Sequence, residues 1–178
     1  MSDLAERVAA ESIGFLRDTY VPRLATALEA LPEGDLWWRP HPDVIAFGTI
    51  MLHLEGNVRQ WICSGLGDLP DHRDRASEFT AEDGPAGPEL LARLSATIDE
   101  ACTVIESMDE ARLLAEFTIQ GFATSGLNAV YHVVEHFSWH TGQITSIAKQ
   151  RAGEQHGLAF YDEAKVNAAR NEPNSEPA

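Results

Sequence analysis

The chain has 178 residues, 44% of them apolar, and a formal net charge of −15 at pH 7. This length favours one domain with a sizeable core, and no apolar run approaches the roughly 18 residues that cross a bilayer. The negative charge disfavours nucleic acids and anionic membranes as partners, because both are bound through Lys and Arg.

The N-terminus and the cysteines indicate a soluble, cytoplasmic protein. Residues 1–7 mix both signs of charge and lack the apolar core of a signal peptide. Cys63 and Cys102 are isolated and match no metal-binding spacing. We therefore expect two reduced thiols that pack as small hydrophobic groups.

A long first helix is predicted over residues 3–31. Pro22 lies inside this stretch, so we expect a kink near Tyr20 and Val21. The proline-rich segment that follows predicts a loop, in which Trp37 and Trp38 either pack onto the body or line a pocket. Apolar residues mark the helix at the expected spacing: Leu4, Val8, Ile13, Leu16, Tyr20, Leu24, Leu28 and Leu31.

The pattern predicts a second helix from about Ala46 to Ser64, with a wide apolar face. His53 lies beside that face, and Asn57 follows one turn later. A single His beside an apolar stripe is more often a core residue than a ligand. His53 therefore becomes a candidate ligand only if a pair of histidines elsewhere lacks its partner. The polar segment 65–87 predicts a long, ordered surface loop.

Two further helices follow. Pro88 suits the first turn of a third helix that extends to about Met108. Residues 113–122 show strand-like alternation without an obvious partner, so we expect an extended connection there. Thr124 or Ser125 can cap a fourth helix that ends near Gly153.

Each predicted helix carries one apolar stripe, which predicts an all-α fold, a four-helix bundle with long crossover connections. We assign residues 1–165 to this single domain, and we expect the apolar patch 158–161 to pack on its body. The remaining residues 166–178 are expected to form a frayed tail.

Three of the seven histidines, His132, His136 and His140, recur at intervals of four in the fourth helix. Residues four apart lie on one face, so one ion can bind either His132 with His136 or His136 with His140. The outer two are about 12 Å apart along the axis, too far for one ion. Either pair needs a third ligand, which His53 can supply if the bundle brings it to the centre. Three imidazoles with open positions are typical of reactive metal sites.

Two other metal motifs match less well. A di-iron carboxylate bundle needs a Glu three residues before a ligand His, and none of the candidate histidines has one. Residues 132–136 do match the His-x-x-Glu-His pattern of inverted zinc proteases. Such an enzyme also needs a further acidic ligand and a substrate cleft with an edge strand. The helical chain offers little of either, so this is a minor alternative.

The segments 53–57 (His-Leu-Glu-Gly-Asn) and 136–143 (His-Phe-Ser-Trp-His-Thr-Gly-Gln) resemble the DinB-like superfamily of bacterial four-helix-bundle metalloproteins. The likeness covers roughly residues 5–160, and His-x-x-x-His-x-Gly-Gln is its specific part. It implies that His53, His136 and His140 bind a divalent metal ion, zinc or nickel, and that the protein is a homodimer. Many members have a basic residue or a second His just before Gly-Gln, where Trp139 and Thr141 stand here, which leaves the substrate open.

The resemblance implies a metal-dependent enzyme that activates a thiol or water, as a thiol S-transferase or a hydrolase of a small molecule. Its expected partner is therefore a small-molecule substrate such as a low-molecular-weight thiol. The alternative is a non-catalytic, metal-pinned bundle for small-molecule binding or stress response, its pocket closed by Trp37, Trp38 or Trp61. A role as a DNA-repair partner is suggested only by the family name, and the net charge argues against it.

Three residues near the predicted ligands are candidates for supporting roles. Asn57 and Gln143 lie near a ligand by helical spacing and can orient an imidazole. His132 lies one turn before His136 and can either contact that ligand without binding the metal itself or face the pocket. Glu135 points about 100° away from His136, so we do not expect it to act as a base.

Overall fold

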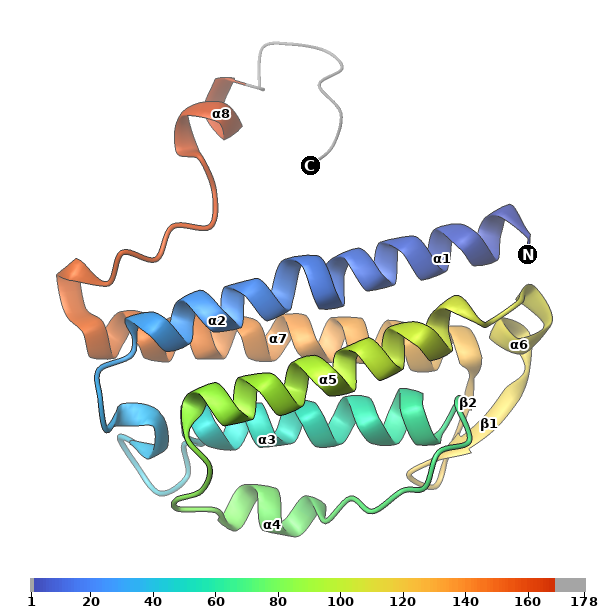
Figure 1. Cartoon of the computed structure of the whole chain (residues 1–178), viewed down its shortest axis with the longest axis horizontal. Coiled ribbons are helices and arrows are strands. Elements are labelled where there is room, and N and C mark those ends of the chain that lie inside the picture. Colours follow the sequence, from blue (N-terminus) through green and yellow to red (C-terminus); the bar gives the residue numbers. More distant parts are fainter. Residues whose placement is uncertain (1, 169–178) are drawn as a thin grey trace.

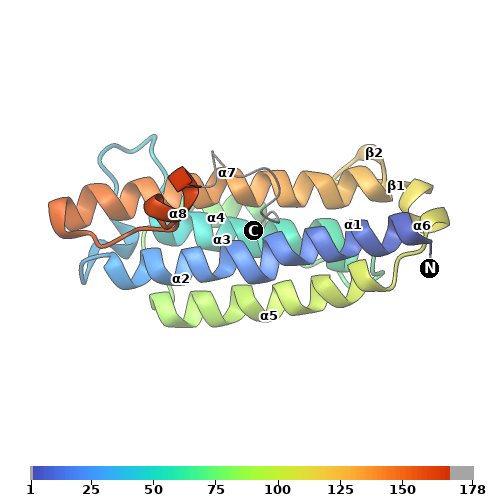
Figure 2. The ribbon, with the colours of Figure 1, turned by 90° about the horizontal axis from the view of Figure 1, so that it is seen from above.

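The computed structural model describes residues 2–168, and its main body is a bundle of four long helical rods (Figure 1). The predicted all-α fold is confirmed. Turning the molecule by 90° shows that the rods run along a common long axis (Figure 2). No helix within residues 2–168 combines the length and the apolar character that crossing a membrane requires.

The first rod joins α1 (Asp3–Ile13) to α2 (Val21–Ala30) through the π-helical segment Gly14–Tyr20. Pro22 occupies the first turn of α2. At the place where the proline predicts a kink, the helix changes its winding: the backbone N–H of Val21 bonds to the carbonyl of Leu16, five residues back. Pro22, which has no N–H to donate, lies in the first turn of the helix that follows, where a proline is tolerated.

The second rod consists of α3 (Phe47–Val58) and the π-helical segment Arg59–Ser64. It packs against α5 (Gly87–Glu106) and against α7 (Gly126–Ala152), the third and fourth rods. Side chains are buried on more than one face of α3, because the short helix α4 (Arg75–Thr80) lies against its outer side. His53, one residue of the site described below, is among these buried side chains.

The segment expected to be a plain loop, 65–87, contains α4. The side chain of Asp74 caps this helix by accepting a hydrogen bond from the Ser77 amide at 3.1 Å. Asp74 followed by helix-forming residues was a usable signal. Its six residues are too few to show a periodic apolar stripe, which is why periodicity alone predicts a loop.

The connection before α7 is a short helix, α6 (Glu110–Leu114), followed by an antiparallel hairpin of β1 (Glu116–Ile119) and β2 (Phe122–Ser125). The expectation of an unpartnered extended segment was therefore wrong. Its partner is the stretch that follows it directly. Gln120 and Gly121 both adopt positive φ, as a two-residue hairpin turn requires.

The ends of α7 agree with the prediction. The Ser125 hydroxyl accepts from the Asn128 amide at 3.1 Å, and Gly153 follows the last helical residue with φ +70°. Leu158 is buried, as expected for the apolar patch. The expected frayed tail lies mostly outside the described residues; the described part includes a last short helix, α8 (Glu163–Ala168), so the boundary at residue 165 stays a prediction.

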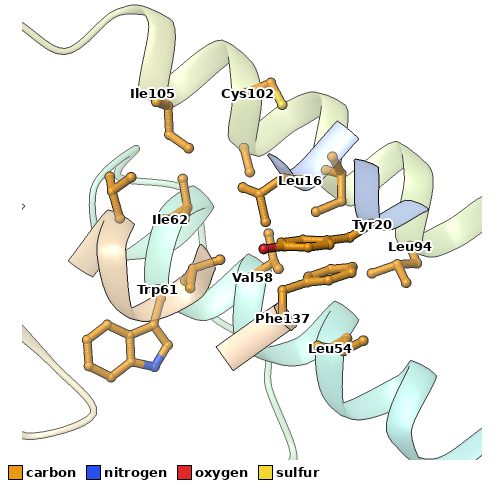
Figure 3. Packing of buried hydrophobic residues seen from close by; sticks show 14 of the residues in the cluster. Leu16, Tyr20, Leu54, Val58, Trp61, Ile62, Leu94, Cys102, Ile105 and Phe137 are labelled. Carbon is orange, nitrogen blue, oxygen red and sulfur yellow. The ribbon is translucent and has the colours of Figure 1, made fainter. Parts of the chain in front are cut away.

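The core is one continuous apolar cluster shared by all four rods (Figure 3). Tyr20 and Phe137 stack with ring centroids 5.7 Å apart, between Leu16 and Leu54. Cys63 and Cys102 are free and buried in this cluster. The aromatic stack holds the middle of the first rod against α7, one residue beyond His136.

Candidate metal centre

Three imidazoles from α3 and α7 meet between the second and fourth rods. The Nε2 atom of His136 lies 3.1 Å from that of His53 and 3.2 Å from that of His140. The three possible ligand atoms all lie within 4.8 Å of one another. His53 is buried, and the other two are half-buried.

The packing of α3 against α7 explains this convergence. His136 and His140 are one turn apart and project from the same face of α7. His53 lies on the buried side of α3, which faces α7. The structure thus groups His136 with His140, and not with His132, in the three-histidine cluster.

His132 lies outside that cluster. Its ring packs on Trp61, with centroids 4.1 Å apart, and its centroid is 5.5 Å from that of His136. Burial lowers the pKa of His132 below its ordinary value. Glu135 is exposed. The His-x-x-Glu-His alternative would need His132 as a ligand, and the observed arrangement gives it another neighbour.

The outer ring nitrogens show which way two of the imidazoles present their lone pairs. His53 Nδ1 lies 2.9 Å from a carboxylate oxygen of Glu78, and His140 Nδ1 lies 2.7 Å from the amide oxygen of Gln143. Arg73 Nη2, a donor, also lies 3.1 Å from His53 Nδ1, but it bonds more closely to Glu78, at 2.8 Å. Because an ionised carboxylate and an amide oxygen can only accept, we assign the hydrogen to Nδ1 in both rings. A neutral imidazole has only one N–H, so both Nε2 atoms point lone pairs toward His136.

This donor set fits a divalent metal ion. Nitrogen ligands at about 2.0–2.1 Å around a tetrahedral ion stand a little over 3 Å apart, close to the separations of the neighbouring Nε2 atoms. Neutral imidazole is also a common ligand for zinc and nickel. Three protein ligands leave at least one position open, as in catalytic sites.

The surroundings of His136 and His140 favour their neutral forms. Burial, reinforced by the neighbouring His140 and His53, lowers the pKa of His136 to about 3. Burial also lowers the pKa of His140, against the opposing effect of its Gln143 hydrogen bond. Both rings are therefore unprotonated on one nitrogen at neutral pH and available to a metal.

Sequence reasoning missed Glu78 and Arg73. The Arg73 guanidinium donates to both carboxylate oxygens of Glu78, at 2.6 and 2.8 Å. Burial opposes ionisation of Glu78, but the bonds from Arg73 and His53 outweigh it and lower the pKa of the carboxyl. Both residues lie in the segment expected to be an ordered surface loop. The Asp74 cap marks the start of a helix there, but it does not show that this helix packs against α3.

Of the two residues predicted to orient an imidazole, Gln143 and Asn57, one does so. Gln143 contacts His140 as expected, whereas Asn57 makes no hydrogen bond to an imidazole within residues 2–168. The Asn57 side-chain oxygen is one of three buried polar atoms near the site without a hydrogen-bond partner in this part of the chain. The others are Trp61 Nε1 and His136 Nδ1. His53 also packs against Phe79 of α4, with ring centroids 4.8 Å apart.

A large cavity lies elsewhere in the molecule. It has a volume of about 790 Å³, and its walls are mainly apolar, including Leu28, Trp37, Gly84 and Leu91. Trp37 also packs on Gly48 at the start of α3. Trp38 faces the Arg151 guanidinium at 4.0 Å. The two tryptophans thus anchor their loop, and one of them lines a cavity as well.

The Trp139 and Thr141 positions do not add a group to the cluster. Trp139 is exposed and lies beside a groove lined by Tyr20, Tyr131 and Val134. The Thr141 hydroxyl donates to the carbonyl of Phe137 at 2.8 Å, inside α7. Where many DinB-like proteins have a basic residue or a second histidine, this chain has a surface aromatic and a core hydroxyl.

Comparison with known families accounts for most of the chain. No curated protein sequence matches it. The sequence profile of the DinB superfamily matches residues 18–144, which include all three histidines of the cluster and all of α3. The matched region, the bundle and the position of the histidines agree with the resemblance seen in the sequence. The chain belongs to the DinB superfamily.

Proposed function

We propose that this protein binds one divalent metal ion, zinc or nickel, through His53, His136 and His140. We further propose that it is a metal-dependent enzyme that activates a thiol or water for attack on a small electrophile. The convergence of three imidazoles on one point carries the proposal. Its reaction class is that of a thiol S-transferase or a hydrolase.

The residues around the proposed metal ion would have distinct roles. A divalent ion in such a site lowers the pKa of a bound water or thiol, so that the nucleophile is deprotonated at neutral pH. Glu78 and Gln143 hold two of the imidazoles with their Nε2 atoms facing inward. Phe79 covers the His53 ring and keeps water away from that side. The two cysteines cannot replace an external thiol, because burial raises the pKa of each to about 11.

Elemental analysis of protein purified without a chelator or an affinity tag tests the metal directly. We expect about one zinc or nickel ion per chain, and loss of that ion in His53→Ala, His136→Ala and His140→Ala. His72→Ala is the matched control, because His72 is exposed and lies outside the cluster. Unchanged metal content in all three cluster variants would rule out the assigned ligands.

The reaction class needs its own test. We expect a screen of low-molecular-weight thiols with small electrophiles, and of small hydrolysable esters and amides, to show turnover that chelation abolishes and zinc or nickel restores. Turnover that survives chelation and the His136→Ala change would contradict a metal-dependent reaction.

The apolar cavity favours a second candidate, a metal-pinned bundle that binds a small molecule without catalysis. Its volume of about 790 Å³ suits a small ligand, and its walls do not include the three histidines. The two candidates differ in whether the bound metal keeps an exchangeable water. Water-proton relaxation of the manganese- or cobalt-substituted protein measures this: fast exchange supports the enzyme, and its absence supports the structural metal.

We also propose a cytoplasmic homodimer that binds neither nucleic acid nor membrane. The net charge of −15 and the two free, buried thiols support the location and the absence of a polyanionic partner. A row of large apolar side chains, exposed along α1, the following π-helical segment and α7, supports the dimer. It contains Leu4, Phe15, Leu127, Tyr131 and Trp139.

A further inference from the structure

We infer that Glu78, held by Arg73, is a positioning residue for His53. It fixes the imidazole with the hydrogen on Nδ1, so that the Nε2 lone pair faces His136 and His140. The inference rests on the proposed metal site for its functional meaning. The position of the hydrogen on His53, however, can be measured without any metal.

The contact between Glu78 and His53 is short and buried, and the Arg73 guanidinium fixes the orientation of the carboxylate. The Glu78 carboxylate approaches His53 Nδ1 at 2.9 Å, and Arg73 holds the same carboxylate with two hydrogen bonds of 2.6 and 2.8 Å. The Arg73 side chain is only 3% exposed, and that of Glu78 is 9% exposed. A carboxylate clamped on its far side in this way has little freedom to turn away from the ring.

Further hydrogen bonds hold Arg73 itself. Its Nη1 donates to Gln60 at 3.0 Å, and its backbone amide donates to Asp71 at 3.0 Å. Gln60 in turn donates to the Asp71 carboxylate at 2.7 Å. The network therefore ties the loop before α4 to the second rod, and it ends at His53.

Gly56 on α3 makes room for the pair. A Cβ at this position would lie 2.2 Å from a carboxylate oxygen of Glu78 and 2.8 Å from Nε of Arg73. Any larger residue would force the ion pair away from the helix. The glycine thus costs α3 some helix propensity, while allowing a charged pair to lie on its outer face beside His53.

The tautomer matters because a neutral imidazole can carry its hydrogen on either nitrogen. With the hydrogen on Nε2, His53 has no lone pair facing the other two histidines. Two groups face Nδ1: the Glu78 carboxylate, an acceptor at 2.9 Å, and Arg73 Nη2, a donor at 3.1 Å that bonds Glu78 at 2.8 Å. The closer carboxylate favours the Nδ1–H form and makes the ring a stronger donor to a metal. His140 has only a neutral amide on its outer nitrogen, so His53 is the more strongly oriented of the two rings.

The first experiment compares wild type with Glu78→Ala and Glu78→Gln. Nitrogen-15 NMR of the metal-free protein reports which ring nitrogen of His53 carries the hydrogen, and chelator competition gives the zinc affinity. We expect the Nδ1–H form in wild type, its loss in Glu78→Ala, and at least partial recovery in Glu78→Gln, whose amide oxygen still accepts. Zinc affinity should fall about 10- to 100-fold in Glu78→Ala.

A second variant leaves the carboxylate in the sequence, in case Glu78→Ala fails to fold around an unpaired Arg73. Gly56→Ala should displace the ion pair and weaken zinc binding in the same way. Gly14→Ala is its control, because Gly14 is also inside a helical rod and its added Cβ would meet nothing within 4 Å. We expect wild-type zinc affinity and the Nδ1–H form of His53 in this control.

The outcomes separate this inference from the proposed function. If wild type binds zinc but Glu78→Ala and Gly56→Ala keep both its affinity and its His53 tautomer, Glu78 has no positioning role. If wild type binds no metal and the Nδ1–H form still depends on Glu78, the positioning stands and the metal proposal fails. A wild-type His53 with its hydrogen on Nε2 would overturn the inference outright.

Discussion

The three histidines of the cluster differ in what lies at their outer nitrogen, Nδ1. His53 meets a buried carboxylate, His140 meets an amide, and His136 Nδ1 has no hydrogen-bond partner within residues 2–168. The three rings therefore differ in how firmly they are held. Hydrogen bonds at Nδ1 orient the rings of His53 and His140, whereas the polar contacts of the His136 ring are with those two histidines, through Nε2.

The lowered pKa of His136 predicts acid sensitivity of the metal-free protein. Between the ordinary value of 6.5 and about 3, the unfolded chain binds a proton at this residue that the folded chain does not. Stability should therefore fall as the pH falls below about 6.5. Glu78, whose pKa is also lowered, should add to the loss below its ordinary value of 4.5.

Urea unfolding of the metal-free protein from pH 7.5 to pH 5 measures this effect. We expect His136→Asn to reduce the slope of the free energy of unfolding against pH, because Asn does not titrate. The reduction should correspond to the uptake of about one proton on unfolding. His72→Asn, at an exposed position, should retain the wild-type slope. Equal slopes in the wild type and His136→Asn would contradict the burial of a neutral imidazole.

Gln143 offers a test of the weaker outer contact. It is exposed, and its amide oxygen lies 2.7 Å from His140 Nδ1. We expect Gln143→Ala to weaken zinc binding by no more than about 10-fold, at the low end for such supporting residues. The matched control is Gln150→Ala, on the same helix and away from the cluster. Chelator competition measures the zinc affinity of both variants. If Gln143→Ala weakened zinc binding more than Glu78→Ala, Gln143 and not Glu78 would be the more important supporting residue.

At the scale of the elements, α7 carries two of the three proposed ligands and must start and end in the right register. Its start is fixed by the Ser125 hydroxyl, which accepts from the Asn128 amide. We expect Ser125→Ala to lower the free energy of unfolding by about 1 kcal/mol. Ser138→Ala, inside α7 and exposed, should cause no loss. Urea denaturation compares them, and equal stability of the two variants would show that the cap contributes nothing.

Apolar periodicity predicts the long rods of this protein well but not its short elements. The first rod, α3, α5 and α7 each carry a sustained stripe, and the Ser125 and Gly153 signals mark the ends of α7. The helix α4 and the hairpin are too short to carry such a stripe, and contacts with the bundle stabilise them. Before Pro22 the backbone adopts a π-helical winding, which spacing rules do not describe.

The same limit explains what could be predicted of the site. Spacing leaves two histidine pairs open in α7 and makes His53 a candidate third ligand. The family resemblance then selects His136 with His140 and not His132 with His136. Nothing in the local pattern around Glu78 shows that it contacts a residue 25 positions earlier. Such a contact follows from how the 65–87 segment folds over α3, which only the tertiary structure shows.

At the scale of the whole molecule, the exposed apolar row along α1, the following π-helical segment and α7 is the feature that predicts self-association. We expect wild type to sediment as a dimer, and Tyr131→Glu to sediment as a monomer with unchanged metal content. Leu69→Glu is the control, because Leu69 is also partly exposed but lies in the loop after the second rod. A monomeric wild type, or a dimeric Tyr131→Glu, would place the interface elsewhere or remove it.

The whole-molecule account depends on one claim, that a single ion joins the second rod to the fourth through imidazole nitrogens. X-ray absorption spectroscopy of the zinc-loaded protein tests it most directly. The account predicts scattering from three imidazoles at about 2.0–2.1 Å, reduced in His136→Ala. Sulfur ligands at about 2.3 Å, or a spectrum unchanged in His136→Ala, would contradict it.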